Sequence, residues 1–76
     1  MYYLERNGHR IGYSMQSLPA LELYRARYIQ DRLDSEAGQV QEKHLERTGE
    51  LLHMSEAVLN ALNTLEDELV IKEIKQ

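Results

Sequence analysis

The chain contains no cysteine and only one proline among its 76 residues. Without cysteine it can form neither a disulfide framework nor a thiolate zinc site. Disulfides accumulate in oxidising compartments, so their absence favours the cytoplasm as the setting of this protein.

Long apolar runs are absent as well. No uninterrupted apolar run exceeds Met1-Tyr2-Tyr3-Leu4, whereas a membrane-spanning helix needs about 20 apolar residues. Glu5, Arg6 and Arg10 interrupt the N-terminal region, which therefore does not have the pattern of a secretory signal peptide. We expect a protein that neither spans a membrane nor carries such a signal.

The residues that are present are typical of one small folded domain. Hydrophobic residues make up 42% of the chain and charged residues 29%. This balance is too apolar for a disordered chain and too charged for a membrane span. Residues 1–76 are therefore expected to form a single domain.

The formal net charge of −4 is unevenly distributed. Residues 1–32 carry three acidic and five basic side chains, a net charge of +2, together with all five tyrosines. Residues 33–76 carry ten acidic and four basic side chains, a net charge of −6. The overall negative charge argues against a dedicated nucleic-acid binder, whose domain usually carries positive charge.

The clearest local pattern lies at the start of the chain. Asn7-Gly8 is the preferred pair for a two-residue type I′ turn, because both positions need a positive φ. The sequence therefore predicts a β-hairpin over 2–14, and its apolar face must pack on another element. The expected cross-strand pairs are Leu4 with Ile11, Tyr2 with Tyr13, Glu5 with Arg10, and Tyr3 with Gly12.

A first helix is predicted over 18–37. Ser17 suits the N-cap, Pro19 falls in the first turn, and Gly38 is a natural stop. The apolar residues of this segment form two neighbouring arcs, which make its apolar surface wider than one partner helix needs. One arc holds Leu18, Ala26, Ile29, Leu33 and Ala37, and the other holds Leu21, Tyr24 and Tyr28.

A second, longer helix is predicted over 41–75, along a leucine-rich stripe from Leu45 to Leu69. Gly49 interrupts it at a cost of about 1 kcal/mol relative to alanine, but no proline or turn cluster breaks the run. The tail over 70–75 is ambiguous. Its β-branched residues also suit an edge strand beside the hairpin, but the i,i+4 pair Glu68 and Lys72 suits a helix end, and the helix is favoured.

Together these elements define a mainly α fold class: an N-terminal β-hairpin followed by an antiparallel two-helix hairpin with a short link around Gln39. The first helix offers only about five turns, whereas the leucine stripe of the second helix spans about seven. Its uncovered leucines predict that the fold is completed by dimerisation, as a homodimer.

No motif for catalysis or metal binding stands out. The five-residue elbow of a nucleophilic serine is absent, and Gly8 and Gly12 do not form a phosphate loop. Glu50 and His53 have the E-x-x-H spacing of carboxylate-bridged metal pairs, but helical geometry turns them away from the leucine stripe, so two solvated side chains are the favoured interpretation. We predict no enzymatic activity, no metal site and no cofactor.

The feature with most functional content is the set of arginines and tyrosines near the N-terminus. Tyr24 and Tyr28 are an i,i+4 pair with Arg25 and Arg32 beside them. Tyr and Arg dominate protein-binding hot spots, although both rings could simply receive the apolar face of the hairpin. The predicted partner-binding residues are Tyr24, Arg25, Tyr28 and Arg32, with Arg6, His9 and Arg10 at the hairpin tip.

These observations predict a small non-enzymatic protein–protein interaction module that acts as an adaptor, regulator or inhibitor. Two alternatives remain open. The Arg/Tyr patch could stack on single-stranded bases and hold phosphates, as in a nucleic-acid-associated regulator. The acidic residues of 33–76 could instead mimic nucleic-acid phosphates and block a DNA-binding protein.

Overall fold

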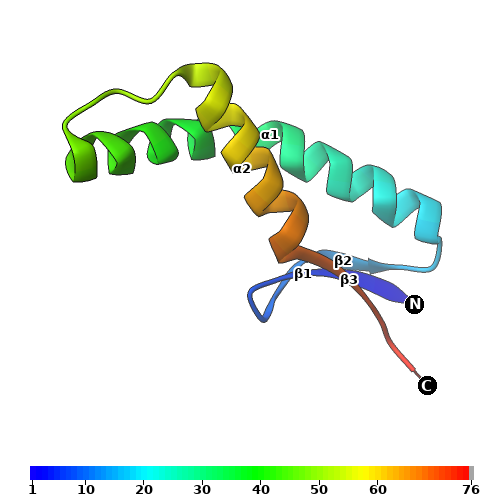
Figure 1. The fold of residues 1–76 in the computed structure, drawn as a ribbon. Coiled ribbons are helices and arrows are strands. Elements are labelled where there is room, and N and C mark those ends of the chain that lie inside the picture. Colours follow the sequence, from blue (N-terminus) through cyan, green and yellow to red (C-terminus); the bar gives the residue numbers. More distant parts are fainter. Residues whose placement is uncertain (76) are drawn as a thin grey trace.

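The computed structural model describes residues 1–75 of the chain. Two strands come first, two helices follow, and a third strand closes the fold, so that the sheet and the helices form two layers (Figure 1). The elements are β1 (Tyr2–Arg6), β2 (His9–Met15), α1 (Leu18–Thr48), α2 (Met54–Glu68) and β3 (Leu69–Glu73).

The predicted hairpin is confirmed. Asn7 and Gly8 have φ values of 52° and 83°, as the type I′ turn requires. Leu4 pairs with Ile11 and Glu5 with Arg10, but Tyr2 lies opposite Met15 rather than Tyr13. The register shifts between Tyr2 and Leu4, opposite a segment in which Gly12 has a φ of 70°. This irregularity in β2 could not be predicted from the turn alone.

The sheet has a third strand, in the order β2-β1-β3. β3 is antiparallel to β1, with Ile71 opposite Leu4 and Leu69 opposite Arg6. The helix favoured for 70–75 is therefore wrong, and the alternative of an edge strand is correct. β3 pairs the edge of β1 that the hairpin leaves free, and it brings Leu69 into the core, which gives the β-branched tail a better environment than a helix end.

α1 begins as predicted and ends much later. The Ser17 side chain accepts a hydrogen bond from the backbone N–H of Ala20 at 3.3 Å, and a proline lies in the first turn. The helix continues through Gly38 to Thr48, so its predicted end at residue 37 is wrong. It stops at Gly49, which has a φ of 76° and donates its N–H to the carbonyl of Leu45 at 2.8 Å.

The second helix is correspondingly shorter than predicted. α2 begins at Met54 and not at residue 41, and the link between the helices covers 49–53 instead of lying at Gln39. The backbone N–H of Ser55 donates to the ring of His53, which is the N-cap. The two interior glycines thus have the reverse of their predicted roles, because only Gly49 adopts the left-handed conformation that ends a helix.

The core consists of two clusters. The first lies between the sheet and both helices, and its five members are buried. The second lies where α2 crosses α1 (Figure 1) and consists of three alanines, which let the helices approach closely. The predicted leucine stripe of helix two is therefore only partly correct, since Leu59 is 57% exposed. The first cluster contains Leu4, Leu21, Ile29, Leu65 and Leu69, and the second contains Ala37, Ala57 and Ala61.

The molecule is elongated, with principal extents of 51 × 20 × 15 Å. The last turns of α1 and the 49–53 link project away from the sheet (Figure 1). We refer to residues 41–53 as the arm. No helix within residues 1–75 combines the length and the apolar character needed to cross a lipid bilayer.

Candidate functional site

Arg6 joins the sheet to both helices. It lies at the end of β1, immediately before the hairpin turn. Its guanidinium forms a bidentate ion pair with the Glu36 carboxylate of α1, with nitrogen–oxygen distances of 2.6 and 3.0 Å. Its Nε also donates to Glu68 at the end of α2, at 3.1 Å. The side chains of Arg6 and Glu36 are each 19% exposed, so this junction is largely shielded from water.

The partners of Arg6 favour its charged form. The hydrogen bond with Glu36 is the main cause that raises the pKa of Arg6 above its ordinary value, and the bond with Glu68 acts in the same direction. Partial burial of the guanidinium opposes this shift. These contacts indicate that Arg6 has a role in holding the fold together.

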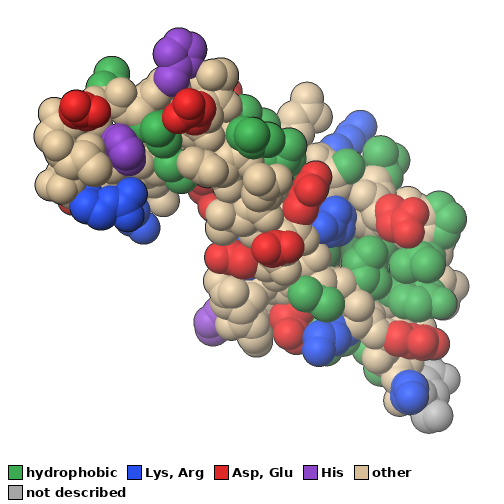
Figure 2. All heavy atoms as spheres, in the orientation of Figure 1, with side chains coloured by type: hydrophobic (Ala, Val, Ile, Leu, Met, Phe, Trp, Pro, Cys, Tyr) green, Lys and Arg blue, Asp and Glu red, His purple; other side chains and the backbone are tan. Residues whose placement is uncertain are grey.

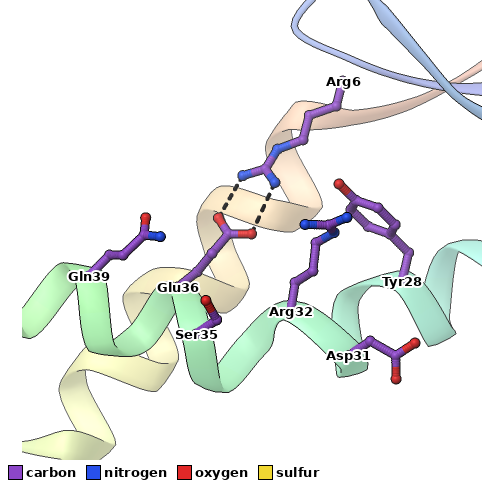
Figure 3. A pocket seen from close by; sticks show the side chains of 7 residues that line it. All are labelled: Arg6, Tyr28, Asp31, Arg32, Ser35, Glu36 and Gln39. Carbon is purple, nitrogen blue, oxygen red and sulfur yellow. Dashed lines mark hydrogen bonds and ion pairs between the residues drawn. The ribbon is translucent and has the colours of Figure 1, made fainter.

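A hollow of about 500 Å³ lies beside this junction. Arg6 reaches down to Glu36 from the hairpin, while Tyr28 and Arg32 rise from α1 toward the same space (Figure 3). The Arg32 guanidinium carbon lies 4.3 Å from the centroid of the Tyr28 ring, a cation–π contact. Asp31, Ser35 and Gln39 complete the lining, which is therefore polar and of mixed charge.

Tyr24 and Arg25, the neighbours of this site on α1, are used internally. Tyr24 is half-buried, packs on the first core cluster, and lies so close to Gly12 that a Cβ there would be 2.5 Å from the tyrosine Oη. Arg25 donates to the backbone carbonyls of Glu66 at 2.8 Å and Leu69 at 3.2 Å. Its cation thus satisfies carbonyl groups at the C-terminal end of α2.

The two residues after the hairpin turn are exposed. The Arg10 guanidinium carbon lies 4.3 Å from the centroid of the Tyr3 ring. Tyr3 and Arg10 alternate along their strands with the core-facing Leu4 and Ile11, so this pair lies on the opposite face of the sheet. His9 is exposed and pairs with Arg6 across the hairpin.

The structure therefore brings together only part of the predicted surface. Arg6, Tyr28 and Arg32 meet at one hollow, whereas Arg25 faces the end of α2 and Arg10 lies on the other side of the sheet. Sequence reasoning missed Glu36 and Glu68, the partners of Arg6. The sequence pairs Glu68 with Lys72 at i,i+4 and gives Glu36 no role, because no local spacing connects either of them with Arg6.

The E-x-x-H pair does not lie on a helix. Glu50 belongs to the link and His53 caps α2, so the helical spacing on which a metal-binding reading depends is not formed. Among residues 1–75, no group of three or more His, Asp and Glu side chains is arranged to hold a metal ion.

Comparison of the chain with protein families, with curated proteins and with solved structures finds no match.

Proposed function

We propose that this protein is a small non-enzymatic module that binds another protein through the Tyr28–Arg32 surface. The observation that carries the proposal is the contact of Arg32 with the Tyr28 ring at the polar hollow of about 500 Å³. Tyr and Arg are the residues most enriched in binding hot spots, together with Trp.

The arrangement limits the entropic cost of binding. Tyr28 is half-buried and packs on the first core cluster, so the fold restricts its ring. Arg32 is exposed but rests on that ring, which reduces the freedom that it loses when a partner arrives. The hollow beside them offers a place for one polar side chain of the partner, because donors and acceptors both line it.

The two nucleic-acid alternatives differ from this proposal in their response to salt and nuclease. A complex in which Arg32 neutralises phosphates weakens steeply as the salt concentration rises. An acidic mimic would depend on the carboxylates of residues 33–76 and not on Tyr28 or Arg32. A complex of two proteins at the Tyr28–Arg32 surface survives nuclease and requires Arg32.

The experiment compares Arg32→Ala with Arg27→Ala as bait for partners from the source cell, with and without nuclease. Both arginines are exposed on α1, but only Arg32 lines the hollow. We expect the wild type and Arg27→Ala to capture the same protein after nuclease treatment, and Arg32→Ala to bind it at least about tenfold more weakly. Equal binding by both variants, or loss of the partner on nuclease treatment, would refute the proposal.

A further inference from the structure

The chain exposes more surface than a compact protein of its size. Its accessible surface is 5643 Å², whereas a compact monomer of 8.9 kDa exposes about 4,800 Å². The excess of about 800 Å² follows from the elongated shape, which leaves room for one side of an interface of standard size. The arm projects beyond the sheet, at the end of the molecule far from both termini (Figure 1).

The tip of the arm presents a leucine to solvent. The Leu51 side chain is 70% exposed, more than that of any other leucine within residues 1–75. Its neighbour Leu52 packs on the second core cluster, and the Leu52 carbonyl accepts a hydrogen bond from the Gln41 side chain at 2.9 Å. The backbone N–H of Glu50 donates to the Thr48 hydroxyl at 3.2 Å. The link is thus anchored on both sides of Leu51.

The arm also borders a hollow of its own, of about 370 Å³. Val40 and Leu52 supply apolar lining, while Lys43 and Arg47, one helical turn apart on α1, supply positive charge. Both ion pairs found within residues 1–75 are made by Arg6, so in that part of the chain neither Lys43 nor Arg47 has a carboxylate partner. His44 and Asn60 complete the lining.

The tip and the hollow are complementary in chemistry. An exposed leucine with a carboxylate beside it at Glu50 matches an apolar hollow with two cations beside it. Basic, acidic and hydrophobic side chains lie close together on the arm in the space-filling view (Figure 2). Since one chain carries both halves, two copies related by a twofold axis would make the same contact twice and would close the assembly as a dimer.

We propose that the arm is a homodimer interface in which the Glu50–Leu51 tip of each copy occupies the Val40–Leu52 hollow of the other. Glu50 then faces Lys43 and Arg47 of the second copy. Leu45 on α1 and Met54 at the start of α2 are exposed as well, and either could add apolar area to the contact. The arm hollow and the Tyr28–Arg32 hollow share no lining residue, so dimerisation and partner binding can be measured separately.

The first test is sedimentation over a wide range of concentrations, with Leu51→Ser and Leu23→Ser as matched variants. Leu23 is 61% exposed on α1 and lies outside the arm. We expect the wild type and Leu23→Ser to dimerise, and Leu51→Ser to dimerise at least about tenfold more weakly while its circular dichroism spectrum matches that of the wild type. A wild-type protein that is monomeric at every concentration would overturn the proposal, as would equal dimerisation of both variants.

The second test exchanges the charges. Glu50→Lys alone and the pair Lys43→Glu and Arg47→Glu should each weaken the dimer, because like charges then face one another. The triple variant restores the opposite charges and should regain most of the lost affinity. All three residues are exposed, so circular dichroism should show a retained fold. A triple variant no better than its parents would contradict the assignment of the contact.

Discussion

Arg6 and Glu36 lie thirty residues apart in the sequence and form a bidentate ion pair between β1 and α1, with nitrogen–oxygen distances of 2.6 and 3.0 Å. Glu68 of α2 binds the same guanidinium. One side chain thus fixes the positions of three elements that local sequence does not relate. The pair is largely shielded from water. Removal of the Arg6 guanidinium would therefore leave the carboxylates of Glu36 and Glu68 near each other without their cation.

We predict that Arg6→Met lowers the free energy of unfolding by about 2 kcal/mol, between the value of an exposed pair and that of a fully buried one. The melting temperature should fall by roughly 10 °C. Urea titration monitored by circular dichroism measures the change. Arg10→Met is the matched control, since Arg10 contacts Tyr3 on the exposed face and should contribute no more than about 1 kcal/mol.

A double variant separates the pair from the packing of the arginine stem. Glu36→Met alone also breaks the pair, whereas Arg6→Met with Glu36→Met removes both charges and leaves apolar groups of similar length. The double variant should be less destabilised than the sum of the single variants, by about 1 kcal/mol or more. Simple additivity would show that the pair contributes nothing of its own.

The two interior glycines of the helical region should respond to alanine with opposite signs. A Cβ at Gly38 would meet nothing within 4 Å, and the residue lies inside α1, so Gly38→Ala should raise the free energy of unfolding by up to about 1 kcal/mol. Gly49 is equally open but has a φ of 76°, so Gly49→Ala should lower it by about 1 kcal/mol. Thermal melting compares the two variants. If both melting temperatures shifted in the same direction, Gly38 could not be a helix-interior residue while Gly49 is the left-handed helix stop.

These glycines also show what limits prediction from this sequence. Each one is a credible helix stop, and the choice depends on packing that local sequence does not specify. Val40 reaches the second core cluster only if α1 continues through Gly38, and Leu52 reaches it only if the chain turns after Gly49. The β3 tail is a similar case, because it becomes a strand through pairing with β1, more than 60 residues earlier.

The hairpin and the Tyr28–Arg32 pair were predictable because both are local. Asn7-Gly8 sets the turn, and the i,i+4 spacing brings Tyr28 and Arg32 together. The carboxylates that bind Arg6 are distant in sequence, and they resemble the many solvated acids of the same helices. The hollow of the candidate site could not be predicted, since it depends on where the hairpin tip meets α1.

Gly12 should tolerate alanine poorly, because of both its backbone and its neighbour. It has a φ of 70°, and a Cβ there would lie 2.5 Å from Oη and 2.9 Å from Cζ of Tyr24. We predict that Gly12→Ala lowers the free energy of unfolding by about 2–4 kcal/mol. This is the sum of the cost of a left-handed backbone conformation at alanine and the cost of the steric clash with Tyr24. Gly8→Ala isolates the first contribution, since Gly8 has a φ of 83° and no neighbour within 4 Å of a Cβ.

The clash is tested by changing Tyr24. In a Tyr24→Leu background the ring is gone, so the cost of Gly12→Ala should fall to about the 1–2 kcal/mol expected of the backbone alone. Chemical unfolding of the four proteins in this cycle gives the coupling. An equal cost of Gly12→Ala in the two backgrounds would mean that the Tyr24 ring does not clash with a Cβ at position 12.

Arg25 should stabilise the junction of α2 and β3 in particular. It donates to the carbonyls of Glu66 and Leu69, which no following helical turn satisfies. Arg25→Ala should lower the free energy of unfolding by about 1–2 kcal/mol. It should also speed hydrogen exchange at the amides of Leu69–Glu73 more than at those of His9–Met15.

Arg27→Ala is the control, since Arg27 is an exposed neighbour on α1. It should change the free energy of unfolding by less than about 0.5 kcal/mol and leave hydrogen exchange in both strands unaltered. Equal acceleration in both strands would indicate that Arg25 acts on the whole fold, because a bond at the end of α2 should protect β3 first.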